Sequence, residues 1–318
     1  MRLIHQGLGA IGQGIARLAL ERGHVIVAAA DIDPAKAGRD LGTLLGGAPL
    51  GVEVTADPAE ALRRPADILI HCTGSHLGAV LPELEEALRA GLDVVSTCEE
   101  LSFPWFHHPA EARRLDDLAR AREATVVGLG VNPGFVMDAL PILLTAPCRE
   151  VARVVVERVV DTAERRPALR GKTGAGLTPQ AFRAGVREGR LGHVGLVESV
   201  AMIGDALRWP LARITEEIDP VTVNGVVRGL HQVARGHREG ESSTPAIHLD
   251  LTMAVGAPNP RDTLTIEGHP HLRVEIPGGV PGDLATWATV VNTLPIIRDA
   301  PPGLWPVSRL PLLHLTRP

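Results

Sequence analysis

The first 31 residues contain the pattern that most restricts how this chain can fold. An apolar run, Met1 to Gln6, leads directly into the glycine-rich turn Gly7–Gly12; a helical segment and a second apolar run ending at Asp31 follow. A strand, a glycine turn, a helix and a strand in this order are typical of a Rossmann nucleotide-binding unit. We therefore predict that these residues bind a dinucleotide cofactor and are not merely a structural turn.

The turn residues have separate expected roles. Gly7 permits the tight turn, Gly9 lets the backbone approach a pyrophosphate, and Gly12 lets the helix pack closely on the strand. Ala10 and Ile11 lie at the helix N-terminus, where N–H groups and partial positive charge favour phosphate.

Two residues bear on the choice between NAD and NADP. Asp31 follows Gly12 by nineteen residues, close to the spacing of a carboxylate that binds the adenosine ribose hydroxyls. This carboxylate would repel a 2′-phosphate and slightly favours NAD. Arg39 is near enough in sequence to support NADP, so use of both cofactors stays open.

Composition restricts the class of protein. A length of 318 residues is enough for about two domains, and 45% apolar residues support a buried core. A net charge of −5 and the lack of a basic run argue against nucleic-acid binding. The sequence shows neither an apolar run long enough for a membrane-spanning helix nor the pattern of a signal peptide, so we expect neither membrane insertion nor secretion. Three widely spaced cysteines predict reduced thiols in the cytoplasm and no metal site.

Strand-like and helical segments alternate from residue 1 to about 137. This alternation predicts an α/β fold with a doubly wound parallel sheet and helices on both faces. Within it we expect a helix over Pro34–Leu45. Ligands of such a sheet bind at the carboxyl ends of its strands.

The pattern changes at about Asp138. Segments 138–281 no longer alternate and predict a second, α+β domain with a mixed or antiparallel sheet, in which Val221–Val233 forms one strand. A helix over Gly282–Ile297 and the proline-rich tail to residue 318 are expected to return to the first domain.

Glu99 and Glu100 are the best candidates for catalysis. They follow an apolar strand and precede an aromatic segment that contains Phe103 and Trp105. Carboxylates beside apolar surface are candidates for a raised pKa and for acid–base chemistry. Both could instead be solvated acids at a helix start, and the aromatic residues could be core or the wall of a substrate pocket.

Other polar residues follow the predicted strands. The expected cofactor contacts here are Thr73, Gly74, Ser75, Cys98 and Asn132. Residues 73–75 could instead form a tight turn without a ligand, and Asn132 could have a structural role at the exit into the second domain. His193 precedes a helix and is a candidate proton donor, although packed histidines are more common. Arg165 and Arg166 could hold a carboxylate, but a solvated charge run explains them better. His107 and His108 match no metal-ligand spacing.

These motifs together resemble one family. They are Gly7 to Gly12, Asp31-Ile32-Asp33, Ser96 to Leu101, Gly130 to Asp138, Arg158 to Arg166, Gly192 to Ser199 and Gly282 to Asn292. The chain is similar over essentially its whole length to the 2,4-diaminopentanoate dehydrogenases and native amine dehydrogenases, a branch of the dihydrodipicolinate-reductase-like proteins. Dihydrodipicolinate reductase itself fits less well, because the second domain offers only Lys172 where a lysine-rich segment is expected.

The resemblance implies a homodimeric NAD(P)-dependent enzyme that converts a primary amine or diamino acid to a ketone and ammonia, and the reverse. It implies that Asn292 contacts the cofactor, that Phe135 and His193 line the substrate pocket with Phe103 and Trp105, and that the second domain mediates dimerisation. Two alternatives remain: an imine or ketone reductase that exchanges no ammonia, and a non-catalytic dinucleotide-sensing protein.

Overall fold

The structure is a computed structural model that describes residues 1–163, 171–240 and 244–315. The chain divides into two compact units. The first comprises Met1–Phe135 and Pro281–Pro318, and the second comprises Val136–Val280. Each unit has its own sheet and is described by itself.

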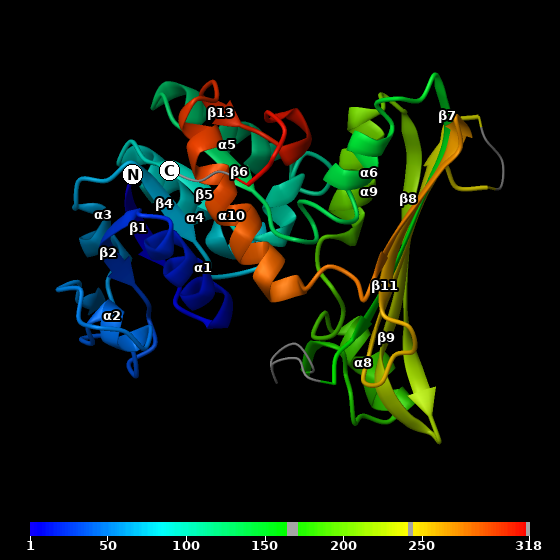
Figure 1. The fold of residues 1–318 in the computed structure, drawn as a ribbon, viewed down its shortest axis with the longest axis horizontal. Helices are drawn as coiled ribbons and strands as arrows, with labels where there is room; N and C mark the ends of the chain where they lie inside the picture. Colours follow the sequence, from blue (N-terminus) through cyan, green and yellow to red (C-terminus); the bar gives the residue numbers. More distant parts are fainter. Residues whose placement is uncertain (164–170, 241–243, 316–318) are drawn as a thin grey trace. The chain divides into compact units, whose positions relative to one another are not determined.

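The first unit contains a seven-stranded parallel sheet with the order β13-β6-β5-β4-β1-β2-β3 (Figure 1). Its strands are β1 Arg2–Gln6, β2 Val25–Ala30, β3 Val54–Thr55, β4 Ile68–His71, β5 Asp93–Ser96, β6 Thr125–Gly128 and β13 Gly303–Leu304. The order reverses between β1 and β4, and dinucleotides bind at such a switch point. The predicted parallel Rossmann sheet is confirmed.

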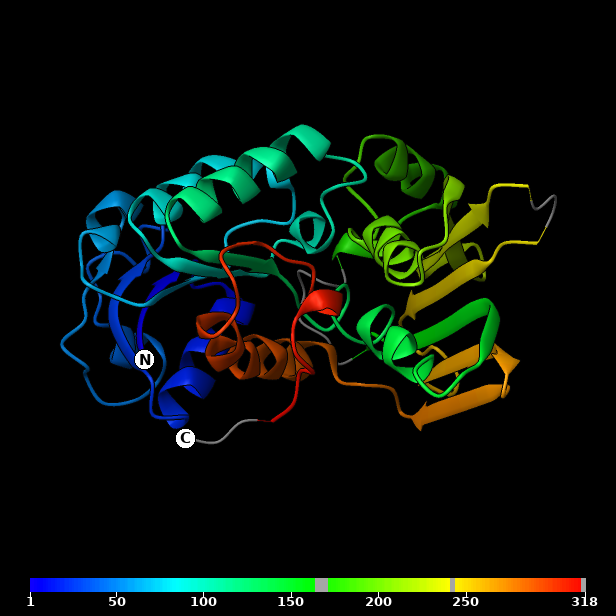
Figure 2. The same ribbon diagram turned by 90° about the horizontal axis from the view of Figure 1, so that it is seen from above.

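Helices cover both faces of this sheet, as Figure 2 shows. The helical segments are α1 Ala10–Glu21, α2 Leu41–Leu44, α3 Pro58–Leu62, α4 Leu77–Arg89, η1 Glu99–Ser102, α5 Pro109–Ala121, α10 Gly282–Arg298 and η2 Val307–Arg309. One apolar core joins the sheet to α3, α4 and α5, and the other joins it to α1 and α10. Two buried cores explain the near-continuous apolar runs of the strands.

The predicted helix over Pro34–Leu45 is wrong in most of its length, because only α2 is helical. Gly38 has a φ of +77°, which ends any helical path before residue 40. The Asp40 carboxylate then accepts hydrogen bonds from the backbone N–H groups of Thr43, Leu50 and Gly51. A single side chain therefore organises a loop where helical periodicity predicted a longer helix.

The second unit contains a six-stranded mixed sheet with the order β12-β11-β7-β10-β9-β8. Its strands are β7 Glu150–Asp161, β8 Leu211–Val223, β9 Val226–Arg238, β10 Ile247–Ala254, β11 Arg261–His269 and β12 Leu272–Pro277. Only the β7–β10 pair is parallel. The helices α6 Ala139–Leu144, α8 Pro179–Arg187 and α9 Leu196–Ala206 lie on one face of this sheet (Figure 1). The predicted α+β class is confirmed.

The predicted single strand over Val221–Val233 is wrong, because it contains a hairpin turn. Asn224 and Gly225 both have positive φ, 51° and 78°, and they connect the long strands β8 and β9. Asn-Gly is the residue pair that two-residue hairpin turns favour. The β-branched run on both sides of this turn concealed it.

Candidate cofactor and catalytic site

The glycine turn has the geometry of a phosphate-binding loop. Gly7 has a φ of +88°, and a Cβ atom there would lie 2.5 Å from the backbone oxygen of Cys72. A Cβ atom at Gly12 would lie 1.9 Å from the backbone oxygen of Gly7. A Cβ atom at Gly9, by contrast, meets nothing within 4 Å. Two glycines are therefore needed for packing, while the third leaves open space at the N-terminus of α1, where a pyrophosphate fits.

Asp31 lies at the end of β2 and is tied to this turn. Its Oδ2 atom accepts hydrogen bonds from the Leu8 backbone N–H at 2.6 Å and from Lys36 Nζ at 3.0 Å, and its Oδ1 atom accepts one from the Asp33 N–H at 2.9 Å. Lys36 also pairs with Asp33 at 3.2 Å. The carboxylate thus supports the turn and already has a cationic partner, whereas Arg39 is exposed.

The side chain of Lys36 stays charged in this position. Burial lowers the pKa of Lys36, but hydrogen bonds to Asp31 and Asp33 raise it by more, so its pKa lies above the ordinary value. Ile32, the residue after Asp31, is 81% exposed. An exposed apolar side chain beside the acid that is predicted to bind the ribose can pack against an adenine ring.

Helix α10 returns to the first unit and packs on α1. A Cβ atom at Gly14 would overlap the Trp287 ring, at 2.0 Å from Cε2, so this glycine lets the two helices approach. Thr286 Oγ1 accepts a hydrogen bond from the Val131 N–H at 3.2 Å. This contact connects α10 to the loop that carries Asn132. Asn292, in the same helix, is half-buried.

The loop after β4 is also arranged by polar contacts. Thr73 Oγ1 lies 2.8 Å from His71 Nε2 and donates to Glu83 Oε2 at 2.9 Å, so its hydroxyl hydrogen has an internal acceptor. A Cβ atom at Gly74 would lie 2.9 Å from Val80 Cγ1. Ser75 accepts a hydrogen bond from the Glu100 backbone N–H at 3.3 Å. The loop that is predicted to meet the nicotinamide ribose is thereby linked to the acidic turn.

The predicted cofactor contact at Cys98 has no support from its side chain. Cys98 is fully buried among the apolar residues that connect the sheet to α4 and α5. Burial raises the pKa of the Cys98 thiol to about 12, and the same holds for Cys72. Both thiols are therefore protonated and unreactive.

The Glu100 carboxylate contacts nitrogen atoms of three other residues. Its Oε1 atom lies 2.8 Å from His76 Nδ1, and its Oε2 atom lies 2.7 Å from the Leu77 backbone nitrogen and 3.0 Å from His108 Nε2. His76 and His108 are the N-cap residues of α4 and α5. Glu100 therefore joins η1 to the start of both helices.

The expectation of a raised pKa is wrong for Glu100. Burial does raise its pKa, but hydrogen bonds from His76 and the Leu77 N–H, with the charges of His76 and His108, lower it by more. The pKa of Glu100 consequently lies below the ordinary value. Glu99, the half-buried neighbour at the start of η1, is the other candidate carboxylate.

The aromatic segment contributes to the core of the first unit. Phe103 is buried and its ring centroid lies 5.1 Å from that of Trp105. Trp105 packs against the core between the sheet, α4 and α5. Phe135 is half-buried at the end of the unit. A role for these residues in substrate binding stays a prediction.

In the second unit His193 is held by a buried glutamine. The His193 backbone N–H donates to Gln232 Oε1, and Gln232 Nε2 donates to the His193 carbonyl oxygen, both at 2.8 Å. Burial, with the positive charges of Arg158 and Lys172, lowers the pKa of His193 to about 4. The ring is therefore neutral near pH 7. Arg158 itself forms a buried ion pair with Asp262 at 2.7 Å.

The remaining predictions concern metal and carboxylate binding. Among residues 1–163, 171–240 and 244–315, no group of His, Cys, Asp or Glu side chains could hold a metal ion. His108 contacts Glu100, at 3.0 Å. Arg165 and Arg166 lie outside the described residues. Sequence reasoning missed Lys36 and the two capping histidines, because only the folded loops bring them to Asp31 and Glu100.

Two family models and one known protein match this chain. Residues 135–316 match the model of the 2,4-diaminopentanoate dehydrogenase C-terminal domain, and residues 1–98 match that of the dihydrodipicolinate reductase N-terminus. The chain is 32% identical to 2,4-diaminopentanoate dehydrogenase from Acetoanaerobium sticklandii, over 98% of this chain and 94% of that protein.

Solved structures are similar as well. An amine dehydrogenase from Mycobacterium smegmatis matches with a TM-score of 0.89 and 28% identity, covering 100% of this chain and 98% of that one. A probable dehydrogenase from Thermotoga maritima matches with a TM-score of 0.61 and 12% identity, over 95% and 90% of the two chains, and shares the fold alone.

Proposed function

The chain belongs to the 2,4-diaminopentanoate dehydrogenase family, and on that premise we propose that it is an NAD(P)-dependent amine dehydrogenase. It would oxidise a primary amine or diamino acid to a ketone and ammonia, and catalyse the reverse reductive amination. The observation that carries the proposal is the half-buried acidic turn, Glu99-Glu100, hydrogen-bonded to the loop after β4 at the carboxyl edge of a nucleotide-binding sheet. The class of reaction, oxidation of an amine, is taken from the similar proteins, which are a 2,4-diaminopentanoate dehydrogenase and an amine dehydrogenase.

The open space beside Gly9 and the N-terminus of α1 fit the cofactor pyrophosphate, and Asp31 fits the adenosine ribose. When bound, the nicotinamide supplies or accepts the hydride. A side chain of the protein must accept the proton that the substrate ammonium loses. An ammonium has no lone pair, so a base must remove a proton before an imine can form. Water then adds to the iminium carbon, and ammonia leaves to give the ketone.

We assign this proton transfer to Glu99. The Glu100 carboxylate already has hydrogen bonds to His76 and the Leu77 N–H and a contact with His108 Nε2 at 3.0 Å, and we infer that these hold it as an ionised structural residue. A carboxylate at Glu99 would also stabilise the positive iminium electrostatically. Phe103, Trp105, Phe135 and His193 stay our candidates for the substrate pocket.

A screen of ketones against NADH and NADPH tests the function. The panel contains small aliphatic ketones and 2-amino-4-oxopentanoate, each with and without ammonium. Ammonia-dependent oxidation of the reduced cofactor, with an amine as product, is expected. Oxidation that needs no ammonia and gives an alcohol would instead support a ketone reductase. Cofactor binding without turnover of any substrate would support a sensor protein.

For cofactor choice we propose that NAD is preferred and that Lys36 permits NADP. Asp31 and Asp33 repel a 2′-phosphate, but the ammonium of Lys36 lies 3.0 Å from one and 3.2 Å from the other. At a separation of about 4 Å, one unit charge changes the interaction energy by about 4 kcal/mol at an effective dielectric constant of 20. This assigns to Lys36 the role that the sequence suggested for Arg39.

Replacing Lys36 by methionine is expected to weaken NADPH binding at least about tenfold, because Asp31 is then no longer neutralised. NADH binding should change by no more than about threefold, since NADH carries no 2′-phosphate. Fluorescence titration of both reduced cofactors measures this. Arg39→Met is the matched control. A larger loss of NADPH affinity in the Arg39 variant would refute the assignment to Lys36.

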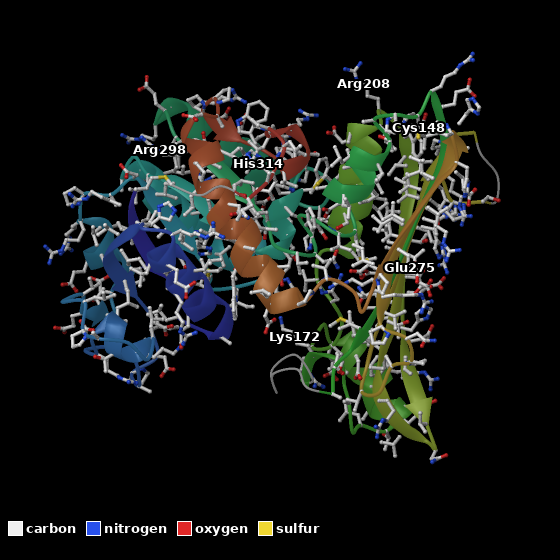
Figure 3. The ribbon with its side chains drawn as sticks, in the orientation of Figure 1. Cys148, Lys172, Arg208, Glu275, Arg298 and His314 are labelled. Atoms are coloured by element: carbon white, nitrogen blue, oxygen red, sulfur yellow. The ribbon has the colours of Figure 1, made fainter. Side chains whose placement is uncertain are left out.

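We also propose that the protein is a homodimer that pairs through the second unit. One face of its sheet carries no helix among the residues that the structure describes, and Figure 3 shows side chains such as Glu275 standing on that face. Three cross-strand ion pairs lie on it, Arg153–Glu267, Arg261–Glu157 and Arg235–Glu217, together with a contact of 3.0 Å between His231 Nε2 and Asp250 Oδ1. Alternating charges make a surface that can pair with a copy of itself.

Light scattering is expected to give twice the mass of the chain. Val155→Glu, in the middle of this face, should shift the protein toward monomer, because a buried unpaired charge is costly. Val25→Glu, on the first unit, is the matched control and should stay dimeric. A monomeric wild-type protein would refute the proposal.

The cytoplasmic location stays a proposal, which three free cysteines support. No described helix is long and apolar enough to cross a membrane.

A further inference from the structure

A chain of polar side chains crosses the carboxyl edge of the first unit's sheet. It joins Gln6 at the end of β1, His71 at the end of β4, Ser96 at the end of β5 and Glu83 in α4. Strand pairing brings three of them together, because His71 is the register partner of both Gln6 and Ser96. His71 and Ser96 are fully buried, whereas the Glu83 side chain is 33% exposed.

Glu83 is the acceptor at one end of this chain. Its Oε2 atom lies 2.6 Å from Gln6 Nε2, 2.9 Å from Thr73 Oγ1 and 3.0 Å from His71 Nε2. Burial raises the pKa of Glu83, but hydrogen bonds from His71 and Thr73 lower it by more. The carboxylate is therefore ionised and can only accept hydrogen bonds. Burial lowers the pKa of the nearby His5 to about 4, so that ring is neutral.

The charge of Glu83 sets the direction of every following hydrogen bond. His71 Nε2 must carry a hydrogen to contact the carboxylate, and we take Nδ1, which faces the Ser96 hydroxyl, as the acceptor of this ring. Ser96 Oγ, 2.8 Å from Nδ1, must then donate its hydrogen to the ring. The oxygen of Ser96 in turn accepts the Cys98 backbone N–H at 3.1 Å. The chain thus ends on the residue before Glu99.

We propose that Glu83 is a positioning residue for catalysis: through His71 and Ser96 it holds the Cys98–Glu99 turn in its reactive geometry. The proposal rests on the proposed role of Glu99. Charged groups that orient a histidine commonly act in this way at a distance from the reacting atoms. Nothing in the sequence distinguishes Glu83 from Glu85 and Glu86 in the same helix.

Glu83→Gln tests the proposal with little change of shape. One amide oxygen must then serve three donors, and the new NH₂ group competes with them. We expect kcat to fall about tenfold at saturating cofactor, with KM for the ketone unchanged. Ser96→Ala should cause a similar loss, and the double variant should lose no more than either single variant. Glu86→Gln, an exposed acid in α4, is the matched control and should retain full kcat.

A second readout needs no turnover. Nitrogen-15 NMR of the His71 ring should show the Nε2–H tautomer in the wild-type protein and its loss in Glu83→Gln, together with faster hydrogen exchange at the Cys98 amide. An unchanged tautomer and unchanged exchange would overturn the proposal, as would additive losses in the double variant. If both change as expected while the wild-type protein aminates no ketone, the hydrogen-bond chain stands and the proposed function has failed.

Discussion

Replacing Glu99 by glutamine is expected to lower kcat for reductive amination at least about 100-fold. Glutamine keeps the size and polarity of the side chain but can neither take a proton from an ammonium nor neutralise an iminium. NADH affinity should stay within about threefold of the wild-type value, because the glycine turn and Asp31 are unaffected. Steady-state kinetics with a responsive ketone and fluorescence titration of NADH measure the two effects separately.

Glu100→Gln is the matched comparison, because it changes the adjacent carboxylate in the same way. Its three donors, His76, Leu77 and His108, would lose a charged acceptor, so we expect lower thermal stability and a loss of kcat of only about tenfold. A larger loss of kcat in Glu100→Gln than in Glu99→Gln would exchange the two assignments. Near-full activity in both variants would remove the acidic turn from the mechanism.

The second large effect concerns the glycine turn, where two alanine substitutions should fail for different reasons. In Gly12→Ala the new methyl would lie 1.9 Å from the Gly7 backbone oxygen, and neither backbone can move away without breaking the turn. We expect a loss of about 3 kcal/mol in the free energy of unfolding. Gly9→Ala should fold normally, because its φ of −66° suits any residue and no atom lies within 4 Å.

Gly9→Ala should nevertheless bind NADH at least about tenfold more weakly, since its methyl would occupy the space proposed for the pyrophosphate. Thermal unfolding and cofactor titration of the two variants distinguish the packing effect from the binding effect. Unchanged NADH affinity in Gly9→Ala would show that the pyrophosphate does not approach this turn. A stable Gly12→Ala variant would show that the turn is less tightly packed than the structure indicates.

Local sequence patterns were reliable where one physical cause acted over neighbouring residues. The glycine turn could be predicted because its positive φ and close packing select glycine whatever surrounds it. Where a distant partner decided the conformation, periodicity failed. The segment predicted as a helix is mostly a loop, because the Asp40 carboxylate accepts hydrogen bonds from N–H groups ten and eleven residues away. The Asn224-Gly225 turn was not predicted, because it lies within a β-branched run.

The candidate site divides in the same way. The sequence placed Glu99 and Glu100 together after a buried strand, but it treated them as equivalent, because both follow the same apolar run. The partners of Glu100 are His76 and His108, which lie twenty-four residues before and eight residues after it along the chain and meet it only when α4 and α5 pack beside η1. Loop closure of this kind leaves no periodic signal.

The sequence by itself determined the nucleotide-binding turn, the parallel first sheet and the family, because these depend on residue types at fixed local spacings. Only the tertiary structure decided which partners the charged groups have. Lys36 neutralises Asp31, two capping histidines hold Glu100, and Glu83 connects to the turn before Glu99 through His71 and Ser96. Electrostatic interactions depend on distance in space and on burial, and neither quantity can be read from the order of residues alone.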